Sequence, residues 1–280
     1  MGLTARSTEP RTLAPFGRRT VDVVAREELG AYVVLAADDA GGPMPRAGQF
    51  YMLAAAERWG GGTDERPFLP RAFSVLRARP GEAATSTRLE FMLEAVGPGT
   101  ERLCELAPGD GLQITGPLGI GFRAPPPGRR ALLCGGGVGT APLAIWQDEL
   151  LACGEPAPAL LGFRDAAHAP GGRLLQNAHV ATDDGSHGHH GLVTDLLADE
   201  LDQDDAVAVY ACGPPPMLEA VRALCERRDV PCQLALEAGM ACGFGACFGC
   251  VVPLRDGGYL RLCVDGPVLD GARLAEVVAH

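Results

Sequence analysis

Hydrophobic and polar residues alternate in short runs along the first part of the chain, from Thr20 to about Gly121. A two-residue period of this kind is typical of β-strands with one buried face. Closely spaced strands separated by turn residues favour a barrel or a sandwich. We therefore predict strands over residues 20–29, 31–38, 48–56, 71–80, 87–96 and 110–119. One short helical segment, residues 99–110, interrupts these strands.

The pattern changes after residue 127, where apolar strands alternate with longer helical runs. Residues 131–154 predict a strand, a glycine-rich turn and a helix. Further strands are predicted over 158–165 and 206–213, and further helices over 193–203 and 215–229. Strands that alternate with helices indicate a parallel sheet. We therefore predict an α+β multidomain fold: a flexible N-terminus (1–18), an antiparallel β-barrel (19–126), a Rossmann-like parallel α/β domain (127–231) and a small C-terminal module (232–280).

Composition narrows the function classes. The chain has 280 residues and a net charge of −11 at neutral pH, which argues against a broad nucleic-acid or anionic-membrane surface. Its longest uncharged runs, Ala131–Gln147 and Ala238–Leu254, fall short of the ~20 residues that a membrane helix needs. The N-terminus has no secretory apolar core. These features predict a cytoplasmic protein, in which cysteines are more often ligands than disulfides.

Four of the ten cysteines are spaced as cluster ligands. Cys242, Cys247 and Cys250 follow the pattern C-x4-C-x2-C, and twelve residues separate Cys250 from Cys263. This is the plant-type [2Fe–2S] pattern. Zinc sites usually show two close cysteine or histidine pairs, so zinc is the competing interpretation. The remaining cysteines other than Cys212 are expected to fill apolar cores: Cys104, Cys134, Cys153, Cys225 and Cys232.

The predicted barrel carries two weak cofactor signals. The sequence "RAFS" spans Arg71–Ser74, where a guanidinium can pair with a pyrophosphate and a hydroxyl can reach an isoalloxazine edge. The sequence "GPGT", Gly97–Thr100, opens the short helical segment and suits phosphate oxygens. Taken alone, an ordinary surface strand and a plain turn explain these residues equally well.

The predicted parallel sheet carries a dinucleotide signal. "CGGGVGTAPL" lies between a strand and a helix, which is the context that a dinucleotide loop requires. The candidate phosphate-binding residues are Gly135, Gly137, Gly139 and Thr140. A second strand-to-helix turn, "YACGPPPML", places Cys212 and Gly213 where they can approach a nicotinamide ring. The alternative for Cys212 is a buried cysteine at a strand end.

In this order the motifs resemble a known family, the electron transfer subunits of class 1B dihydroorotate dehydrogenase, a branch of the ferredoxin–NADP⁺ reductase superfamily. The resemblance covers about residues 20–271 and is carried by "RAFS", "GPGT", "GPLGIGF", "GGGVGTAPL", "TDDGS", "YACGPPPML", "EAGMACGFGACFGC" and "CVDGP". It implies FAD in the barrel, NAD in the middle domain and a [2Fe–2S] cluster in the C-terminal module.

The resemblance also assigns residues. Iron would be held by Cys242, Cys247, Cys250 and Cys263, and FAD would be contacted by Arg71, Ala72, Phe73, Ser74, Met92, Leu93, Glu94, Gly99 and Thr100. Two positions depart from the family pattern. Ala72 replaces the usual proline, and Glu94 stands where the family often has a basic residue facing the FAD phosphates. A carboxylate there would repel phosphate.

The family implies a partner and a pathway. An FMN-containing dihydroorotate dehydrogenase catalytic subunit would oxidise dihydroorotate in pyrimidine biosynthesis, within a heterotetramer, and electrons would pass through the cluster and FAD to NAD⁺. Two other functions stay open: a flavin/iron–sulfur subunit of an NAD(P)H–ferredoxin or sulfide-linked oxidoreductase, and a zinc-stabilised binding module. The dinucleotide also stays open, because Asp165 favours NAD whereas Arg164 favours a 2′-phosphate.

Overall fold

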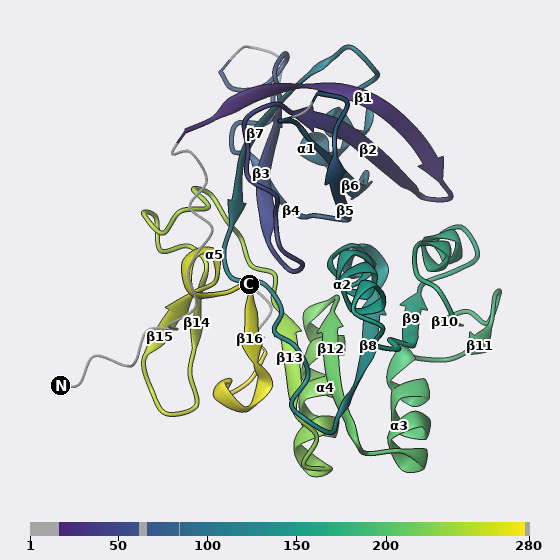
Figure 1. Ribbon diagram of the computed structural model, residues 1–280. Coiled ribbons are helices and arrows are strands. Elements are labelled where there is room, and N and C mark those ends of the chain that lie inside the picture. Colours follow the sequence, from purple (N-terminus) through teal and green to yellow (C-terminus); the bar gives the residue numbers. More distant parts are fainter. Residues whose placement is uncertain (1–16, 62–65, 84, 278–280) are drawn as a thin grey trace.

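Two seven-stranded sheets form the framework of the described part of the molecule and lie one above the other in Figure 1. The computed structural model describes residues 17–61, 66–83 and 85–277. The predicted N-terminal segment, residues 1–18, therefore lies outside the described residues except for Gly17 and Arg18. Within the described residues no helix is long and apolar enough to cross a membrane.

The first sheet is antiparallel throughout, with the strand order β4-β3-β7-β1-β2-β6-β5. Its strands are β1 (Arg19–Leu29), β2 (Tyr32–Asp39), β3 (Phe50–Ala55), β4 (Arg71–Ser74), β5 (Arg77–Pro80), β6 (Thr87–Glu94) and β7 (Gly111–Leu118), and α1 (Pro98–Cys104) lies between β6 and β7. The alternating pattern of the sequence thus indicated the correct fold class.

The residues between β4 and β5 bring the two edges of this sheet together. Val75 donates its backbone N–H to Gln49 O at 3.2 Å, beside β3, whereas Leu76 donates to Glu90 O at 2.8 Å, in β6. The sheet therefore curls into a barrel. The sequence predicts one strand over 71–80, and the structure divides it in two because the chain turns a corner between these hydrogen-bonding partners.

The second sheet is parallel except at one edge, with the order β11-β10-β9-β8-β12-β13-β16. Its strands are β8 (Arg130–Gly136), β9 (Ala159–Phe163), β10 (Ala178–Thr182), β11 (His189–His190), β12 (Val207–Cys212), β13 (Cys232–Ala235) and β16 (Val268–Asp270), the last antiparallel to β13. Helix α2 (Thr140–Ala152) lies on the face toward the barrel, and α3 (Val193–Gln203) and α4 (Pro215–Arg227) lie on the other face (Figure 1). The described residues also contain three 3₁₀ turns: η1 (Gly137–Gly139), η2 (Ala169–Leu174) and η3 (Gly271–Arg273).

The C-terminal lobe is the chain between β13 and β16, and it holds a two-stranded hairpin, β14 (Val251–Pro253) with β15 (Tyr259–Arg261), and the one-turn helix α5 (Leu262–Asp265). Both flanking strands belong to the parallel sheet, where Leu234 pairs with Leu269. The lobe is therefore an insertion at the edge of the middle domain, attached at both of its ends.

Barrel and sheet share a continuous apolar core around α2. Most of this helix is buried, on nearly all of its faces, as expected of a helix packed between two layers. Trp146 of α2 stacks on Phe122 with ring centroids 5.9 Å apart, and Tyr210 of β12 packs edge-on to Phe122 at 5.6 Å. The Tyr210 hydroxyl donates to Arg123 O at 2.8 Å. This packing fixes the two domains against each other.

Candidate functional site

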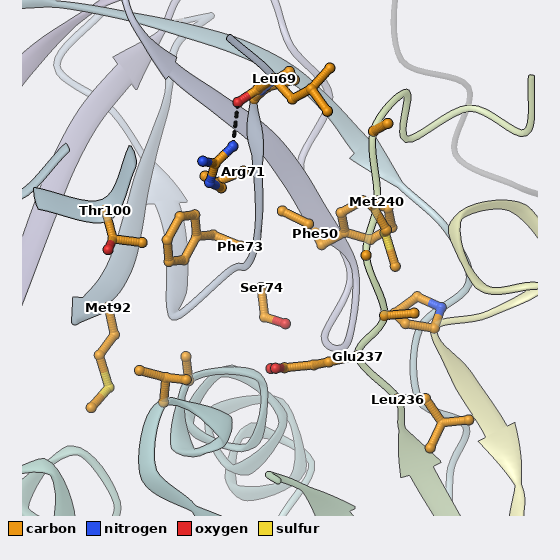
Figure 2. Close-up of a pocket in the computed structure, with 18 residues that line it drawn as sticks. Phe50, Leu69, Arg71, Phe73, Ser74, Met92, Thr100, Leu236, Glu237 and Met240 are labelled. Carbon is orange, nitrogen blue, oxygen red and sulfur yellow. Dashed lines mark hydrogen bonds between the residues drawn. The ribbon is translucent and has the colours of Figure 1, made fainter. Parts of the chain in front are cut away.

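A cavity of about 600 Å³ lies where the barrel, the start of α2 and residues 236–241 meet, and we call it the barrel cavity. Its volume is in the usual range for a small-molecule or cofactor site. The structure brings six of the predicted flavin-site residues to its wall: Arg71, Ala72, Phe73, Ser74, Met92 and Thr100. Figure 2 shows the side chains of Ser74 and Glu237 pointing into this space from the barrel and from the opposite wall.

Arg71 is held in place at the edge of the barrel cavity. Its Nη1 donates to Leu69 O at 2.6 Å (Figure 2). Its guanidinium lies 5.9 Å from the centroid of the Trp59 ring. A Cβ on Gly99 would come within 2.7 Å of Arg71 Nε, so the glycine lets the start of α1 approach the guanidinium. The arrangement offers a fixed cationic fork to an anionic ligand.

The other predicted barrel residues have different surroundings. The Thr100 hydroxyl accepts the N–H groups of Val96 at 2.8 Å and Gly97 at 3.1 Å, so it also holds the turn before α1. Met92 lines the cavity from β6, whereas Leu93 is wholly buried in the core behind it. The alternation of side chains along a strand explains why consecutive residues face different spaces.

A second cavity of about 660 Å³ opens at the carboxyl ends of the parallel strands, and we call it the nucleotide cavity. Ligands of open α/β sheets bind at this edge. Gly137 and Gly213, both predicted, line the cavity. The other predicted residues lie behind its wall, and a Cβ on Gly139 would come within 2.3 Å of the carbonyl oxygen of Cys212. Gly139 is therefore needed where two strand-end loops pack together.

The other predicted nucleotide-site residues, Gly135, Thr140 and Cys212, pack against the protein interior and do not line the nucleotide cavity. A Cβ on Gly135 would lie 2.9 Å from the side chains of Leu143 and Leu161. Thr140 is fully buried, and its hydroxyl has no hydrogen-bond partner in the described part of the chain. Cys212 is 1% exposed, and burial, followed by the charge of Glu237, raises the pKa of its thiol well above the usual range. This cysteine therefore stays protonated.

Glu94 lines the nucleotide cavity and lies outside the wall of the barrel cavity. At the end of β6, its carboxylate forms an ion pair with Arg164, which follows β9. His168 Nε2 is 3.3 Å from the same carboxylate oxygen, and His168 Nδ1 is 2.7 Å from Asp165 Oδ1. Glu94 thus links the barrel to the parallel domain.

Glu237 is a site residue that the sequence reasoning missed. It follows β13 and lines both cavities, as does Val138. Its side chain is exposed to the open space of the two cavities, and desolvation by the nearby protein atoms raises the pKa of the carboxyl group above its ordinary value. The signal for it was available: it is a charged residue at the carboxyl end of a parallel strand, just before the cysteines.

The four cysteines of the C-terminal lobe are arranged in two pairs. Cys250 Sγ lies 3.3 Å from Cys263 Sγ, and Cys242 interacts with Cys247. Burial acts to raise the pKa of Cys242, but the backbone N–H groups of Cys247, Phe244 and Ala246, with the Cys247 side chain, outweigh it and lower that pKa to about 6. The loop therefore stabilises a thiolate at neutral pH, as a metal ligand requires.

Glycines shape the loop that carries these thiols. Gly243 and Gly245 have φ values of 78° and 87°, a region that suits glycine. The N–H of Gly249 donates to Cys247 Sγ at 3.5 Å. No group of three or more His, Cys, Asp or Glu side chains suited to a single metal ion occurs in the described ranges.

The five cysteines expected to fill apolar cores divide into two groups. Cys104, Cys134 and Cys225 are buried, as expected, and Cys232 is half-buried. Cys153 is exposed at the end of α2, where the helix has left the core, so that interpretation of it was wrong.

Solved structures show the class of fold. The structure of an NADH-dependent reduced ferredoxin–NADP oxidoreductase aligns with a TM-score of 0.76 and 24% identity, covering 94% of this chain and 92% of that one. A ferredoxin reductase of carbazole 1,9a-dioxygenase aligns with a TM-score of 0.59 and 23% identity, covering 76% of this chain and 66% of that one. The protein therefore has the fold of the ferredoxin–NADP⁺ reductase class.

Sequence comparisons are more specific. Residues 237–275 match the iron–sulfur cluster binding domain of dihydroorotate dehydrogenase B, and residues 164–223 match the oxidoreductase NAD-binding domain. The dihydroorotate dehydrogenase B (NAD⁺) electron transfer subunit of Geobacillus thermodenitrificans is 36% identical, covering 94% of this chain and 99% of the relative. That of Bacillus caldolyticus is 46% identical, covering 65% and 71%.

The chain belongs to the family of dihydroorotate dehydrogenase B electron transfer subunits. The predicted resemblance is thereby confirmed. The protein is an oxidoreductase subunit with an iron–sulfur-binding and an NAD-binding domain, and its family name implies a catalytic partner subunit.

Proposed function

We propose that the chain holds FAD in the barrel cavity and a [2Fe–2S] cluster on its four paired cysteines, and that it transfers electrons from a dihydroorotate-oxidising catalytic subunit to NAD⁺. The observation that carries this proposal is the path of residues 236–242. Leu236 to Ala241 line the barrel cavity, and Glu237 also lines the nucleotide cavity. Cys242, the first cysteine of the proposed cluster site, directly follows Ala241. One continuous segment would therefore contact the FAD site, the NAD site and the cluster site.

The pairing of the thiols supports the cluster type. A [2Fe–2S] cluster takes its cysteines two to each iron, whereas a structural zinc takes four ligands around one ion. Cys242 with Cys247, and Cys250 with Cys263, supply two such pairs. The backbone N–H groups that lower the pKa of Cys242 would also stabilise negative charge on a cluster.

The barrel cavity supports FAD as the group between the other two. A flavin exchanges electrons either singly or as a hydride, so it connects a one-electron centre to a nicotinamide. On the protein side, Arg71 would bind the pyrophosphate, Ser74 would face the ring system, and Phe73 would pack against its apolar part. The cavity sits beside Cys242, because Leu69, Pro70 and Ala241 line both this cavity and the one that holds Cys242 and Cys263.

The proposed division of labour follows the predicted domains: residues 19–126 bind FAD, 127–231 bind NAD and 232–280 bind the cluster, preceded by residues 1–18. Within residues 232–280, β13 and β16 belong to the parallel sheet, so the cluster would be held by the lobe between these two strands. The partner would be an FMN-containing dihydroorotate dehydrogenase subunit in a heterotetramer. Three exposed aromatic side chains of the C-terminal lobe, Phe244, Phe248 and Tyr259, support contact with another protein at this lobe.

The experiment is co-purification with a visible spectrum and metal analysis. The tagged chain is expressed with its own catalytic subunit and, separately, without it. We expect a flavin and about two iron atoms per chain, and reduction of NAD⁺ by dihydroorotate only when both subunits are present. A colourless protein with zinc would overturn the redox proposal, and activity of the chain alone would overturn its role as a subunit. A coloured chain that reduces only ferredoxin or sulfide-linked partners would favour the second class of oxidoreductase.

A further inference from the structure

Polar side chains from both domains meet at one end of the nucleotide cavity, which Glu94, Arg164 and His168 line. Asp165 lies behind this wall, in contact with His168. Arg164 and Asp165 directly follow β9, the neighbour of the strand that precedes the glycine-rich turn. At this place in a dinucleotide-binding sheet, an acidic residue binds the adenosine ribose 2′-hydroxyl, whereas an arginine accepts a 2′-phosphate. The chain carries both residue types side by side.

The contacts show that the two residues are not equivalent. Arg164 is 64% exposed, but its Nη2 forms an ion pair with Glu94, which is only 19% exposed. The same Nη2 lies 2.6 Å from His168 Nε2, so both neighbours compete for its hydrogen bonds. The only residue of this group that comes from the barrel is Glu94.

Asp165 is oriented by separate contacts. His168 Nδ1 lies 2.7 Å from Asp165 Oδ1, and the Ala167 N–H donates to the same oxygen at 2.9 Å. Asp165 therefore keeps its charge and a fixed position while the charge of Arg164 is offset. Another carboxylate, Asp183, directly follows β10 and lines the nucleotide cavity together with Glu94. The acidic side chains at this end of the cavity, Glu94, Asp165 and Asp183, thus outnumber the arginine Arg164.

We propose that Glu94 is a specificity-determining residue of the nucleotide site, which offsets the charge of Arg164 and repels a 2′-phosphate, so that the cavity selects a nucleotide with an unmodified ribose 2′-hydroxyl. The inference rests on the proposed binding of NAD in this cavity. A phosphate monoester carries a charge of about −1.5 to −2 at neutral pH, whereas the hydroxyl is neutral. Repulsion of the wrong ligand is a common source of such discrimination.

The test is isothermal titration of the full chain, purified with its bound cofactors, with 2′,5′-ADP and with 5′-AMP as probes. The substitution Glu94→Gln removes the charge and keeps the shape. We expect affinity for 2′,5′-ADP to rise about tenfold and affinity for 5′-AMP to stay within about twofold, because only the first probe meets the carboxylate as a like charge. Adding Arg164→Ala should remove the gain. Glu101→Gln, an exposed change on α1 away from the cavity, is the matched control.

Three results would count against the proposal. An unchanged ratio of the two affinities in Glu94→Gln would overturn the role of Glu94 alone. An equal loss of affinity for both probes would show that Glu94 only joins the two domains. Failure of the unmodified chain to bind either probe would overturn the nucleotide site itself, and the inference with it.

Discussion

Gly139 offers a sharp test of how the nucleotide cavity is built. Its backbone angles, φ −63° and ψ −9°, suit any residue, so conformational freedom does not explain the glycine. Its neighbours do. A Cβ at this position would lie 2.3 Å from the carbonyl oxygen of Cys212 and 2.6 Å from the amide nitrogen of Gly213. Both atoms are backbone at the end of β12, so no side chain can turn aside. We predict that Gly139→Ala forces two loops apart.

The size of the effect follows from these distances. Ordinary contact begins near 3.4 Å, so the loops must separate by about 1 Å. Overpacking of this kind costs about 1–3 kcal/mol. Replacing glycine by alanine where the backbone angles suit alanine stabilises the folded state by about 0.4–1 kcal/mol, because it lowers the conformational entropy of the unfolded chain. Because both contacted atoms are backbone, the upper part of the overpacking range applies, about 2–3 kcal/mol, and the net loss of unfolding free energy is about 1–2.6 kcal/mol, or roughly 2–10 °C in Tm.

The assay is thermal unfolding together with nucleotide titration. Gly41→Ala is the matched control, because a Cβ on Gly41 meets no atom within 4 Å and the residue has no positive φ. We expect the control to melt within about 1 °C of the unmodified chain. Gly139→Ala should melt lower and bind nucleotide more weakly, since a displacement of about 1 Å is enough to misplace a bound ligand. Equal melting temperatures for the two variants would refute the steric reasoning.

Three further outcomes follow from the cofactor sites. Cys247→Ser should lose iron and the cluster absorbance while it keeps flavin. Cys153→Ser, which changes an exposed cysteine, should keep iron and flavin, and iron analysis of both variants tests this. Arg71→Ala should weaken flavin retention at least tenfold through the lost charged hydrogen bonds, and the surface change Arg58→Ala should not, as measured by flavin content after dialysis. Desolvation raises the pKa of Glu237, so its contribution to stability is greatest at low pH and falls as pH rises through the folded-state pKa, by an amount that solvent in the cavities reduces. Glu237→Gln should therefore gain in Tm over the unmodified chain between pH 4 and pH 8, and a difference independent of pH would contradict this reasoning.

Local patterns predicted the fold class because strand and helix periods are properties of short segments. The alternation before residue 121 and the strand–turn–helix after Ala131 both correspond to elements of the structure. The strand pattern favoured a barrel or a sandwich, but it could not show which residues close the barrel. Closure depends on Val75 and Leu76 bonding to strands far from each other in sequence. The same holds for β16, which returns across the whole lobe to pair with β13.

The candidate site likewise has features that local sequence patterns predict and features that depend on contacts between distant residues. The cysteine spacing is local, and the family match agrees with the iron–sulfur assignment. Glu94 illustrates the opposite case, because its sequence neighbours suggested a flavin contact while its actual partner, Arg164, lies in another domain. Glu237 is a candidate site residue because it lines two cavities, and the sequence pattern alone does not show where these cavities lie.

Attachment of the C-terminal lobe at both ends has a consequence for how the protein can be altered and monitored. Because β13 and β16 pair in register, Leu234 with Leu269 and Ala235 with Val268, the two ends of the lobe lie side by side. A related lobe could therefore be joined to these strands without cutting the rest of the sheet, provided that it also matches the core that the lobe shares with Phe50 and Met52 of the barrel. Within the C-terminal lobe, a bound cluster would cross-link Cys242, Cys247, Cys250 and Cys263 and so restrict the long connection between β13 and β16. Protease cleavage between Gln233 and Asp270 should then increase when the cluster is lost, which a gel can follow alongside the loss of colour.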